Sequence, residues 1–219
     1  MANARTVLET VALASASPRR RELLSSLGLD VELIPTSYDE SPLPGRSPIE
    51  AALVHARGKT EGARISPHLT IGADTVVDLD GRALGKPRDD DEARAMLAAL
   101  SGRSHQVHTA FALRDPAGRI AVVEAVSTRV RFAALDSATI EAYVASGDGR
   151  DKAGAYGIQG FAATLVERID GDYFTVVGFP LAAFARALPR LGFRLLPRRA
   201  AADPVRARWV RGGQEREPA

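Results

Sequence analysis

Two long segments of this chain, residues 105–113 and 119–133, alternate apolar and polar side chains on either side of the sequence Asp-Pro-Ala-Gly at 115–118. An alternation with a period of two is typical of a strand that buries one face, and a short sequence with proline and glycine is typical of a turn. The pattern therefore predicts a long antiparallel hairpin, which any fold of this chain has to accommodate.

Around this hairpin, apolar periodicity indicates further strands and helices. The expected strands outside the hairpin are 11–14, 31–35, 69–79, 162–169 and 173–177. The expected helices follow Ser17 and Ser47, open at 89–92, and span 136–146 and 180–189. Strands and helices alternate before the hairpin, which favours an α/β fold with a mixed sheet.

The composition excludes several classes of protein. No apolar run approaches the roughly 18 residues needed to span a bilayer, and Glu9 interrupts any signal-peptide core. The chain has no cysteine, which excludes disulfides, thiolate nucleophiles and thiolate zinc sites, and its four histidines form no metal-ligand pattern. We therefore expect a soluble, cytoplasmic protein with no membrane partner.

The charge is distributed unevenly along the chain. The net charge is +2, but residues 198–219 hold six arginines and three acidic residues, a balance of +3. The body of the chain keeps 23 basic and 24 acidic residues, a net charge of −1, and so has no broad positive field for a nucleic-acid backbone. We expect one domain over residues 1–197 that binds no nucleic acid, followed by an Arg-rich, disordered tail over 198–219.

The first group of residues with potential chemistry is the sequence Ser-Ala-Ser-Pro-Arg-Arg at 15–20, between a strand and a helix. Ser17 and Pro18 are typical of a helix cap and a first helical position, so backbone amides would point at this turn. Arg19 and Arg20 oppose the helix dipole unless an anion is present, which favours a phosphate cradle. The alternative is a solvated arginine face behind an ordinary serine cap.

Asp74 interrupts an otherwise apolar strand in the sequence Ile-Gly-Ala-Asp-Thr-Val-Val. An ionised carboxylate in such a place is costly unless a cation or hydrogen bonds compensate it. Facing a cleft, it could bind Mg²⁺, or it could orient and deprotonate a water molecule. It could equally be an Asx-turn or bulge residue at the end of the strand.

Two further residues could contact a ligand. Lys86 is one of only three lysines among 29 basic residues, which suggests a compact charge placed for a phosphate, although a surface lysine is the simpler explanation. Gln159 lies in a Gly-rich segment, and its amide can pair with a base edge that has both donors and acceptors; the alternative is a tight connection. His105 and His108, three residues apart on a strand, point to opposite faces and cannot share a metal.

Taken together, these segments resemble the Maf family of nucleoside triphosphate pyrophosphatases over about residues 11–190. The matching motifs, in order along the chain, are Ala-Ser-x-Ser-Pro-Arg-Arg-x-Glu-Leu-Leu from Ala14, Asp-Glu at 39–40, Gly-Ala-Asp-Thr-Val-Val from Gly72, Gly-Lys-Pro-x-Asp from Gly85, Ser-Gly at 101–102 and Asp-Lys-Ala-Gly-Ala-Tyr-Gly-Ile-Gln-Gly from Asp151. Each motif alone is weak, but their order and spacing are highly specific.

The resemblance implies a two-lobed α/β protein in which a mixed, twisted sheet with flanking helices surrounds a central cleft, as in Maf and inosine triphosphatase-like folds. It also implies hydrolysis of a nucleoside triphosphate to the monophosphate and pyrophosphate with a divalent cation, Mg²⁺ or Mn²⁺. Such proteins are cytoplasmic and often homodimers. The sequence Tyr-Gly-Ile-Gln-Gly from Tyr156 is similar to the branch that acts on dTTP and UTP, with modified pyrimidine triphosphates as further candidate substrates in housekeeping against non-standard nucleotides.

The resemblance further implies roles for single residues. Asp74 is the expected proton acceptor and Lys86 the second catalytic residue, while Glu40 and Asp74 are the expected metal ligands. The residues expected to contact the substrate are Ser15, Arg19, Arg20, Lys59, Thr75 and Gln159.

Two positions depart from the family pattern. Thr60 follows Lys59 where alanine is usual, and Gly-Asp-Gly-Arg at 147–150 replaces Gly-Glu-Pro-x. The alternative functions are a 7-methyl-GTP pyrophosphatase and a nucleotide-binding regulator of septum formation in cell division. Retention of Asp74 and Lys86 argues against a regulator without catalytic activity.

Overall fold

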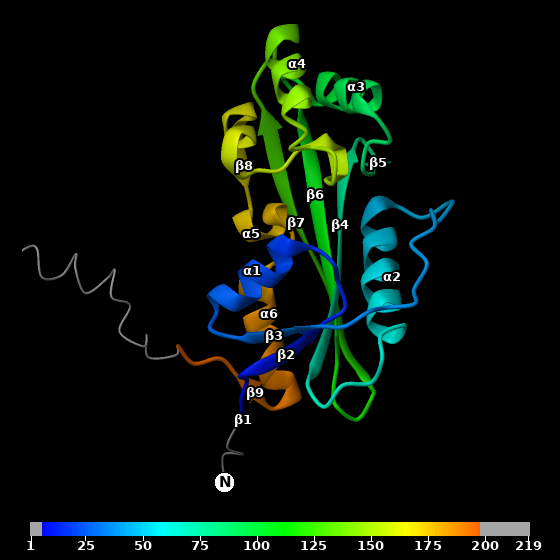
Figure 1. The fold of residues 1–219 in the computed structure, drawn as a ribbon, viewed down its shortest axis with the longest axis vertical. Coiled ribbons are helices and arrows are strands. Elements are labelled where there is room, and N and C mark those ends of the chain that lie inside the picture. Colours follow the sequence, from blue (N-terminus) through cyan, green and yellow to red (C-terminus); the bar gives the residue numbers. More distant parts are fainter. Residues whose placement is uncertain (1–5, 198–219) are drawn as a thin grey trace, which may run out of the picture.

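The computed structural model describes residues 6–197, and Figure 1 shows the path of the chain. Its strands are β1 (Thr6–Val7), β2 (Thr10–Leu13), β3 (Asp30–Leu33), β4 (Leu69–Leu79), β5 (Arg82–Leu84), β6 (Ser104–Arg114), β7 (Ile120–Phe132), β8 (Val166–Asp170) and β9 (Phe193–Arg194). Its helices are α1 (Pro18–Ser26), α2 (Pro48–Glu61), α3 (Asp90–Leu100), α4 (Ser137–Ser146), α5 (Tyr173–Val177) and α6 (Leu181–Ala187). Short 3-10 segments are η1 (Ala153–Ala155), η2 (Gly160–Leu165) and η3 (Leu188–Leu191).

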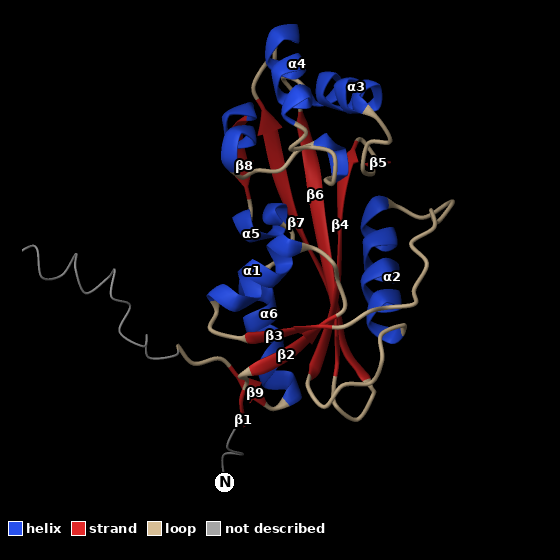
Figure 2. Ribbon diagram, viewed as in Figure 1, coloured by secondary structure: helices blue, strands red, loops and turns tan. Residues whose placement is uncertain are grey.

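Most strands belong to one mixed sheet, in the order β3-β2-β4-β6-β7-β8, with β5 paired to β4. β2 runs parallel to both β3 and β4, whereas the pairs β4–β6, β6–β7 and β7–β8 are antiparallel. The expected hairpin is confirmed, because β6 and β7 pair along nearly their whole lengths. Figure 2 shows β4, β6 and β7 running through the molecule, with α3 and α4 at one end and α1 and α6 nearer the other. The expected α/β class, a mixed sheet with flanking helices, is therefore confirmed.

One edge of β4 changes its partner along the strand, and this change leaves an opening. Residues 69–71 pair with β2, and residues 77–79 pair with β5. Between them, residues 72–76 pair with β6 on one side and with no described strand on the other. Residues 74–76 of this unpaired stretch are only partly buried, so a ligand can reach β4 at this open edge.

Helices α2, α3 and α4 begin with the caps that the sequence indicates, whereas α1 differs. α2 has the expected capping box at Ser47, and the side chains of Asp89 and Asp136 accept hydrogen bonds from backbone amides in the first turns of α3 and α4. Ser17 stands at the cap position of α1, but its side chain makes no capping bond. Instead, Ser17 N donates to Ser15 Oγ at 3.3 Å. The expected positions of Ser17 and Pro18 at the start of α1 are therefore confirmed, but Ser17 lacks the side-chain bond of an ordinary serine cap, and Ser15 takes part in the local turn instead.

Helix α2 packs very closely on β4 because small residues line the contact. Ala52 and Ala56 are completely buried beside Ala110 of β6. A Cβ added to Gly72 would lie 2.2 Å from Thr60 Oγ1 and 2.6 Å from the carbonyl oxygen of Ala56. Thr60 fits beside this contact because its hydroxyl donates to Ala56 O at 2.8 Å. The threonine that departs from the family pattern is thus accommodated by the helix backbone.

Gly72→Ala is expected to lower the free energy of unfolding by about 2 kcal/mol, because the added methyl group would press on backbone atoms that cannot rotate away. Denaturation in urea measures this change. Gly85→Ala is the matched control, since a Cβ at that position meets no atom within 4 Å. Equal stability of the two variants would contradict the close packing of α2 on β4.

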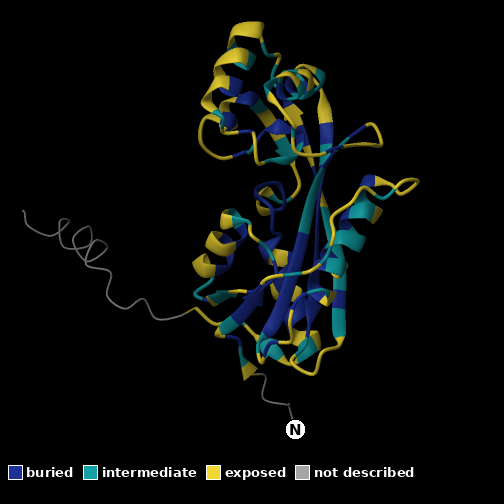
Figure 3. Cartoon of the chain, turned by 45° about the vertical axis from the view of Figure 1, so that its right-hand side comes forward, coloured by how far each residue is buried: buried dark blue, intermediate teal, exposed yellow. Residues whose placement is uncertain are grey.

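The core lies along the strands, which Figure 3 shows as mostly buried. Phe111, Phe179 and Phe184 are completely buried and pack ring against ring, with centroids 5.8 Å and 5.4 Å apart for the successive pairs. Within residues 6–197, none of the helices combines the length and the apolar character that crossing a bilayer requires.

The last third of the chain differs from the sequence-based expectation. Residues 173–177 are not a strand but helix α5, because the Asp172 carboxylate accepts from the backbone amides of Phe174 and Thr175 at 3.3 and 3.1 Å. This cap outweighs the preference of the β-branched residues for a strand. The strand expected over 162–169 begins only at Val166, after η2. β1 and β9 form a separate parallel pair that is too short to leave a pattern in the sequence. The expected tail over 198–219 lies outside the described residues.

Candidate active site

Arg20, on α1, is the centre of a first cluster at the open edge of β4. The side chain is buried, and its Nε donates to the carbonyl oxygen of Gly178 at 2.9 Å. Its Nη1 donates to Ser15 Oγ and its Nη2 to Thr75 Oγ1, both at 3.0 Å. Burial lowers the pKa of the guanidinium from its ordinary value, and the charge of Asp74 opposes that change. Since arginine stays charged in proteins, a fixed positive charge lies between α1, β4 and the segment before α6.

Thr75 is held in this cluster by a chain of hydroxyl groups. Thr109 Oγ1 donates to the carbonyl oxygen of Thr175 at 2.7 Å, so it can only accept at its contact of 2.9 Å with Thr75 Oγ1. The hydroxyl proton of Thr75 is therefore used on Thr109, and its oxygen accepts from Arg20. In this arrangement Thr75 positions Arg20 and has no hydroxyl proton left to offer to a substrate.

Lys59, on α2, is the centre of a second cluster. Its side chain is 6% exposed, and its Nζ lies 2.7 Å from Asp74 Oδ1 and 2.6 Å from Glu40 Oε2. Asp74 is 16% exposed and pairs regularly with Ala110 inside β4, so it is neither a turn nor a bulge residue. A buried ammonium and a mostly buried carboxylate would each be costly alone, and here they compensate each other.

The donor atoms of this second cluster fit a hard divalent cation. Asp74 Oδ2 accepts no hydrogen bond from any described residue, and the Glu40 side chain is 57% exposed. Two carboxylates with free oxygens are typical ligands of Mg²⁺. No group of three or more histidine, cysteine, aspartate or glutamate side chains in residues 6–197 could hold a metal ion, so water and substrate phosphates would have to supply the other ligands.

Tyr38 holds the loop that carries Glu40 against α2. Its Oη lies 3.0 Å from His55 Nδ1, and its ring occupies the space over Gly58, where a Cβ would lie 2.1 Å from a ring atom. Burial raises the pKa of the Tyr38 phenol, and the charges of Asp74 and Glu40 raise it further. The phenol therefore stays protonated beside the two carboxylates.

Arg19 points to a different partner from Arg20. Its Nη1 lies 3.2 Å from Asp151 Oδ2, and the Asp151 carboxylate also pairs with Lys152 Nζ at 2.8 Å. The carboxylate of Asp151 thus compensates the charge of Arg19, and this ion pair joins the start of α1 to the loop after α4. Asp151 is 60% exposed, and an exposed ion pair is weak enough for a phosphate to compete.

Lys86 and Gln159 are both exposed, and neither makes a hydrogen bond or ion pair within the described chain. Leu84 of β5 pairs with Val77, and β5 runs antiparallel to β4, so the chain leads on from β5 toward the open edge. The segment that carries Gln159 is bonded to the same stretch, because Gly154 N donates to Gly85 O at 2.9 Å. The fold therefore brings these two residues toward one side of the site without joining either to Asp74.

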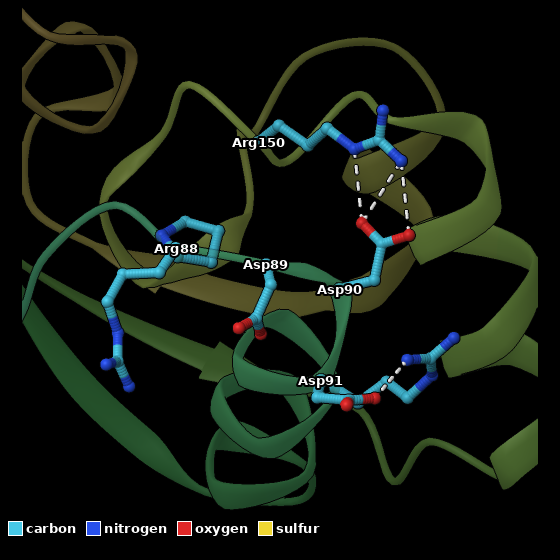
Figure 4. Close-up of a pocket in the computed structure, with 7 residues that line it drawn as sticks. Arg88, Asp89, Asp90, Asp91 and Arg150 are labelled. Carbon is cyan, nitrogen blue, oxygen red and sulfur yellow. Dashed lines mark hydrogen bonds and ion pairs between the residues drawn. The ribbon is translucent and has the colours of Figure 1, made fainter.

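Two hollows of the surface lie apart from both clusters. One, at the start of α3, is shown in Figure 4, where Arg150 pairs with Asp90 and the labelled Asp91 pairs with Arg94, at 3.1 and 2.7 Å. The other lies beside α1 and is lined by Ala16, Ser17, Pro18, Arg21, Glu22, Ser25 and Leu33. Neither hollow is lined by a residue of the Arg20 or Lys59 cluster, so the candidate site is the open edge of β4 and not one of these hollows.

Beneath the Gly-rich segment, His105 of β6 and Tyr156 form a buried pair. His105 Nε2 lies 2.6 Å from Tyr156 Oη, and the two rings and that of Phe132 contact one another edge to face. Burial lowers the pKa of His105 to about 4. The imidazole is therefore neutral at neutral pH.

The free energy of unfolding is expected to fall as the pH drops from about 6.5 to about 4. In the unfolded chain His105 takes up a proton near its ordinary pKa of 6.5, but in the folded chain it does so only near 4, so the unfolded state binds more protons in this window. The difference corresponds to about 3 kcal/mol. Urea denaturation at a series of pH values measures it.

His105→Phe is the control for this pH dependence. Carboxyl groups whose pKa values are lowered, such as those of Glu50 and Asp136, also lose stabilising interactions as the pH falls. The difference between the wild type and His105→Phe isolates the histidine. Parallel pH profiles for the two proteins would contradict the proposed neutral, buried imidazole.

The match to known proteins decides the family to which these motifs belong. The family model described as Maf-like protein matches residues 10–191. This chain belongs to the Maf family.

A dTTP/UTP pyrophosphatase of Syntrophomonas wolfei is 47% identical over 186 residues, which are 84% of this chain and 98% of that protein. A dTTP/UTP pyrophosphatase of Anaeromyxobacter dehalogenans is 50% identical over 186 residues, 84% of this chain and 94% of that protein. A solved structure of a HAM1 protein from Coxiella burnetii is 18% identical with a TM-score of 0.43, covering 84% of this chain and 97% of that one, a likeness too distant to add to the fold described above.

Six of the nine predicted site residues thus meet in two clusters, and Arg19, Lys86 and Gln159 lie outside both. Ser15, Arg20 and Thr75 form one cluster, and Glu40, Lys59 and Asp74 form the other. Thr109, Gly178 and Tyr38 also support the site, although none of them is among the predicted site residues. The alternation along β6 could have marked Thr109 as a buried polar residue, but Gly178 contributes only a carbonyl oxygen, for which a sequence contains no signal.

Proposed function

We propose that this chain hydrolyses dTTP and UTP to the monophosphate and pyrophosphate. The observation that carries the proposal is that Asp74, held by the buried Lys59, and Thr75, bonded to the buried Arg20, are neighbouring residues at the open edge of β4. This edge can offer one ligand both a proton acceptor and several positive charges. The dTTP/UTP pyrophosphatases of the same family, at 47% and 50% identity, support the choice of substrate.

Two kinds of positively charged side chain, buried and exposed, are available to the triphosphate in this proposal. A nucleoside triphosphate carries about four negative charges at neutral pH. Arg20 and Lys59 are buried and held in place, whereas Arg19 and Lys86 are more exposed and can turn toward the phosphates. Positive charge around the departing pyrophosphate stabilises the negative charge that develops on it.

Asp74 is the proton acceptor in this proposal. A water molecule attacks the α-phosphorus in line with the departing pyrophosphate, and its proton passes to the carboxylate. Lys59 orients Asp74 through Oδ1 and leaves Oδ2 without a protein partner among the described residues. This free oxygen has two lone pairs, of which we assign one to the proton and leave the other for the cation.

A divalent cation, Mg²⁺ or Mn²⁺, belongs to the same proposal, with Glu40 and Asp74 as the residues that would hold it. When bound, such an ion would neutralise phosphate charge and so assist the release of pyrophosphate. Activity in excess EDTA, compared with activity after addition of Mg²⁺ or Mn²⁺, tests this part. Full activity in EDTA would refute a requirement for the ion.

In this proposal, Gln159 recognises the base by hydrogen bonds to its edge. Uracil and thymine present the same acceptor, donor and acceptor edge, and an amide can match part of it with its own donor and acceptor. The Gln159 side chain is exposed and without a partner in the described chain, so its amide is available. A site that accepts both dTTP and UTP must also tolerate the 2′-hydroxyl group of UTP.

A panel of dTTP, UTP, CTP, 5-methyl-UTP and 7-methyl-GTP tests the proposed function. We expect pyrophosphate to be released from dTTP and UTP with the highest kcat/KM. Release of orthophosphate and a nucleoside diphosphate would refute the reaction. A preference for 7-methyl-GTP would refute the substrate class while leaving the reaction intact.

We further propose a cytoplasmic homodimer with no membrane or nucleic-acid partner. The lack of cysteine and the net charge of −1 in the body of the chain support the location and the lack of a nucleic-acid partner. The dimer is expected from the resemblance to the family. Sedimentation velocity of the purified protein tests it, and a monomer at micromolar concentration would count against it.

A further inference from the structure

The segment that carries Gln159 reverses direction sharply a few residues before it. Gly154 and Ala155 have φ values of +68° and +59°. An alanine in this left-handed region is strained, because its Cβ crowds the neighbouring backbone. Ala155 is also 1% exposed, so the strain lies inside the protein. A strained and buried reversal keeps its conformation only if the chain is held on both sides of it.

The side before the reversal is held by backbone contacts. Gly154 N donates to Gly85 O at 2.9 Å, and a Cβ on Gly154 would lie 3.0 Å from a methyl group of Val77. This part of the segment is thereby attached to the end of β5 and to β4.

The side after the reversal is held by the packing of Tyr156 and Ile158 in the core and by one short side-chain bond. Tyr156 is 4% exposed, and its Oη lies 2.6 Å from His105 Nε2. A second contact, from Gly157 N to Tyr143 Oη, is longer at 3.4 Å. Gln159 follows three residues after Tyr156 with its side chain exposed. Among the described residues, the His105–Tyr156 bond is therefore the shortest polar contact of residues 155–159.

His105 makes this bond with one ring nitrogen and leaves the other without a hydrogen-bond partner among the described residues. Its Nδ1 is buried and has no partner among the described residues, and burial of an unpaired polar atom is unfavourable. If Tyr156 donates to Nε2, only the Nδ1 proton is left unpaired. If the imidazole donates instead, both the phenol proton and the Nδ1 lone pair are left unpaired. The neutral imidazole is thus best placed as the acceptor of the tyrosine proton.

We infer that His105 is a positioning residue, which holds Gln159 in place through Tyr156 and so contributes to the choice of pyrimidine base. The inference rests on the proposed function, because it concerns the base that Gln159 reads. A phenylalanine at 105 would remove the unpaired Nδ1, but it would leave the buried Tyr156 hydroxyl without its partner. The polar ring is useful at this position because it holds the strained segment.

His105→Phe and Tyr156→Phe test the inference, since each removes the bond and keeps the ring. We expect the ratio of kcat/KM for UTP to that for CTP to fall about tenfold in each variant, through a higher KM for UTP. We expect kcat for UTP to stay within about threefold of the wild type, because neither residue contacts the phosphates. The double variant should be no worse than either single variant, since both remove one interaction.

Two further variants separate positioning from a general effect on the fold. His105→Gln places an amide near the position of Nε2 and should keep most of the UTP preference. His108→Phe is the matched control: His108 lies three residues along the same strand, and its ring contacts Ser127 and Asp78 instead of Tyr156. It should leave the UTP to CTP ratio unchanged. Thermal unfolding of each variant shows whether it is folded.

The outcomes distinguish this inference from the proposed function. Wild-type protein that releases no pyrophosphate from UTP would overturn both. Wild-type activity with an unchanged UTP to CTP ratio in folded His105→Phe and Tyr156→Phe would overturn the inference alone. If His105→Phe fails to fold, Tyr156→Phe, which loses a single oxygen atom, decides the question by the same ratio.

Discussion

Asp74→Asn is expected to lower kcat for dTTP and UTP by about 10³-fold while leaving nucleotide binding largely intact. The substitution keeps the shape of the side chain but removes its ability to accept a proton, a role that contributes about 10² to 10⁴ to the rate of such reactions. Lys59 keeps its ion pair with Glu40 and remains available to the phosphates. Pyrophosphate release measures the rate, and equilibrium binding of the nucleotide measures the affinity.

Asp78→Asn is the matched control for this variant. Asp78 lies on the same strand and the same face, four residues beyond Asp74, and contacts His108 and the backbone amide of Gly81. It should change kcat by no more than about twofold, since it has no contact with the Lys59 cluster. Activity of Asp74→Asn within tenfold of the wild type would exclude Asp74 as the essential carboxylate.

Arg20→Lys is expected to lower kcat/KM by about 100-fold and the free energy of unfolding by about 2 kcal/mol. The charge is retained, but an ammonium cannot reproduce the planar arrangement that bonds Gly178 O, Ser15 Oγ and Thr75 Oγ1 at once. At least one buried acceptor would lose its partner. Kinetics with UTP and denaturation in urea measure the two effects.

Arg21→Lys provides the comparison, because Arg21 is the next residue of the same helix and is exposed. It should behave as the wild type in both measurements. Near-normal activity of Arg20→Lys would mean that the site needs only a positive charge there, and that the three bonds of the guanidinium are not required.

The sequence predicted those elements whose signals are local. The hairpin of β6 and β7, the long strand β4 and the starts of α2, α3 and α4 follow from alternation, apolar runs and caps that lie within a few residues of each other. Where two local signals conflicted, the expectation failed. Residues 173–177 have strand-forming side chains, but the cap at Asp172 makes them a helix.

The motifs supplied the six residues that the structure brings together in two clusters, but not most of the contacts that these residues make. The motifs named Arg20 and Thr75 as substrate contacts, whereas the structure bonds one to the other. Arg20 also bonds the carbonyl oxygen of Gly178, which lies 158 residues away along the chain. Motif order therefore indicates which residues belong to a site, without indicating which of them hold the others in position.

By itself, the sequence determined the α/β class, the family and the motif residues of the two clusters, because periodicity, caps and motif spacing are properties of neighbouring residues. Only the tertiary structure decided that Lys59 lies between Glu40 and Asp74, that a chain of hydroxyl groups directs Thr75 toward Arg20, and that His105 supports the segment before Gln159. These pairings depend on where β2 leaves β4 and β5 joins it. That opening arises from the register of strands far apart in the chain, and no local pattern encodes it.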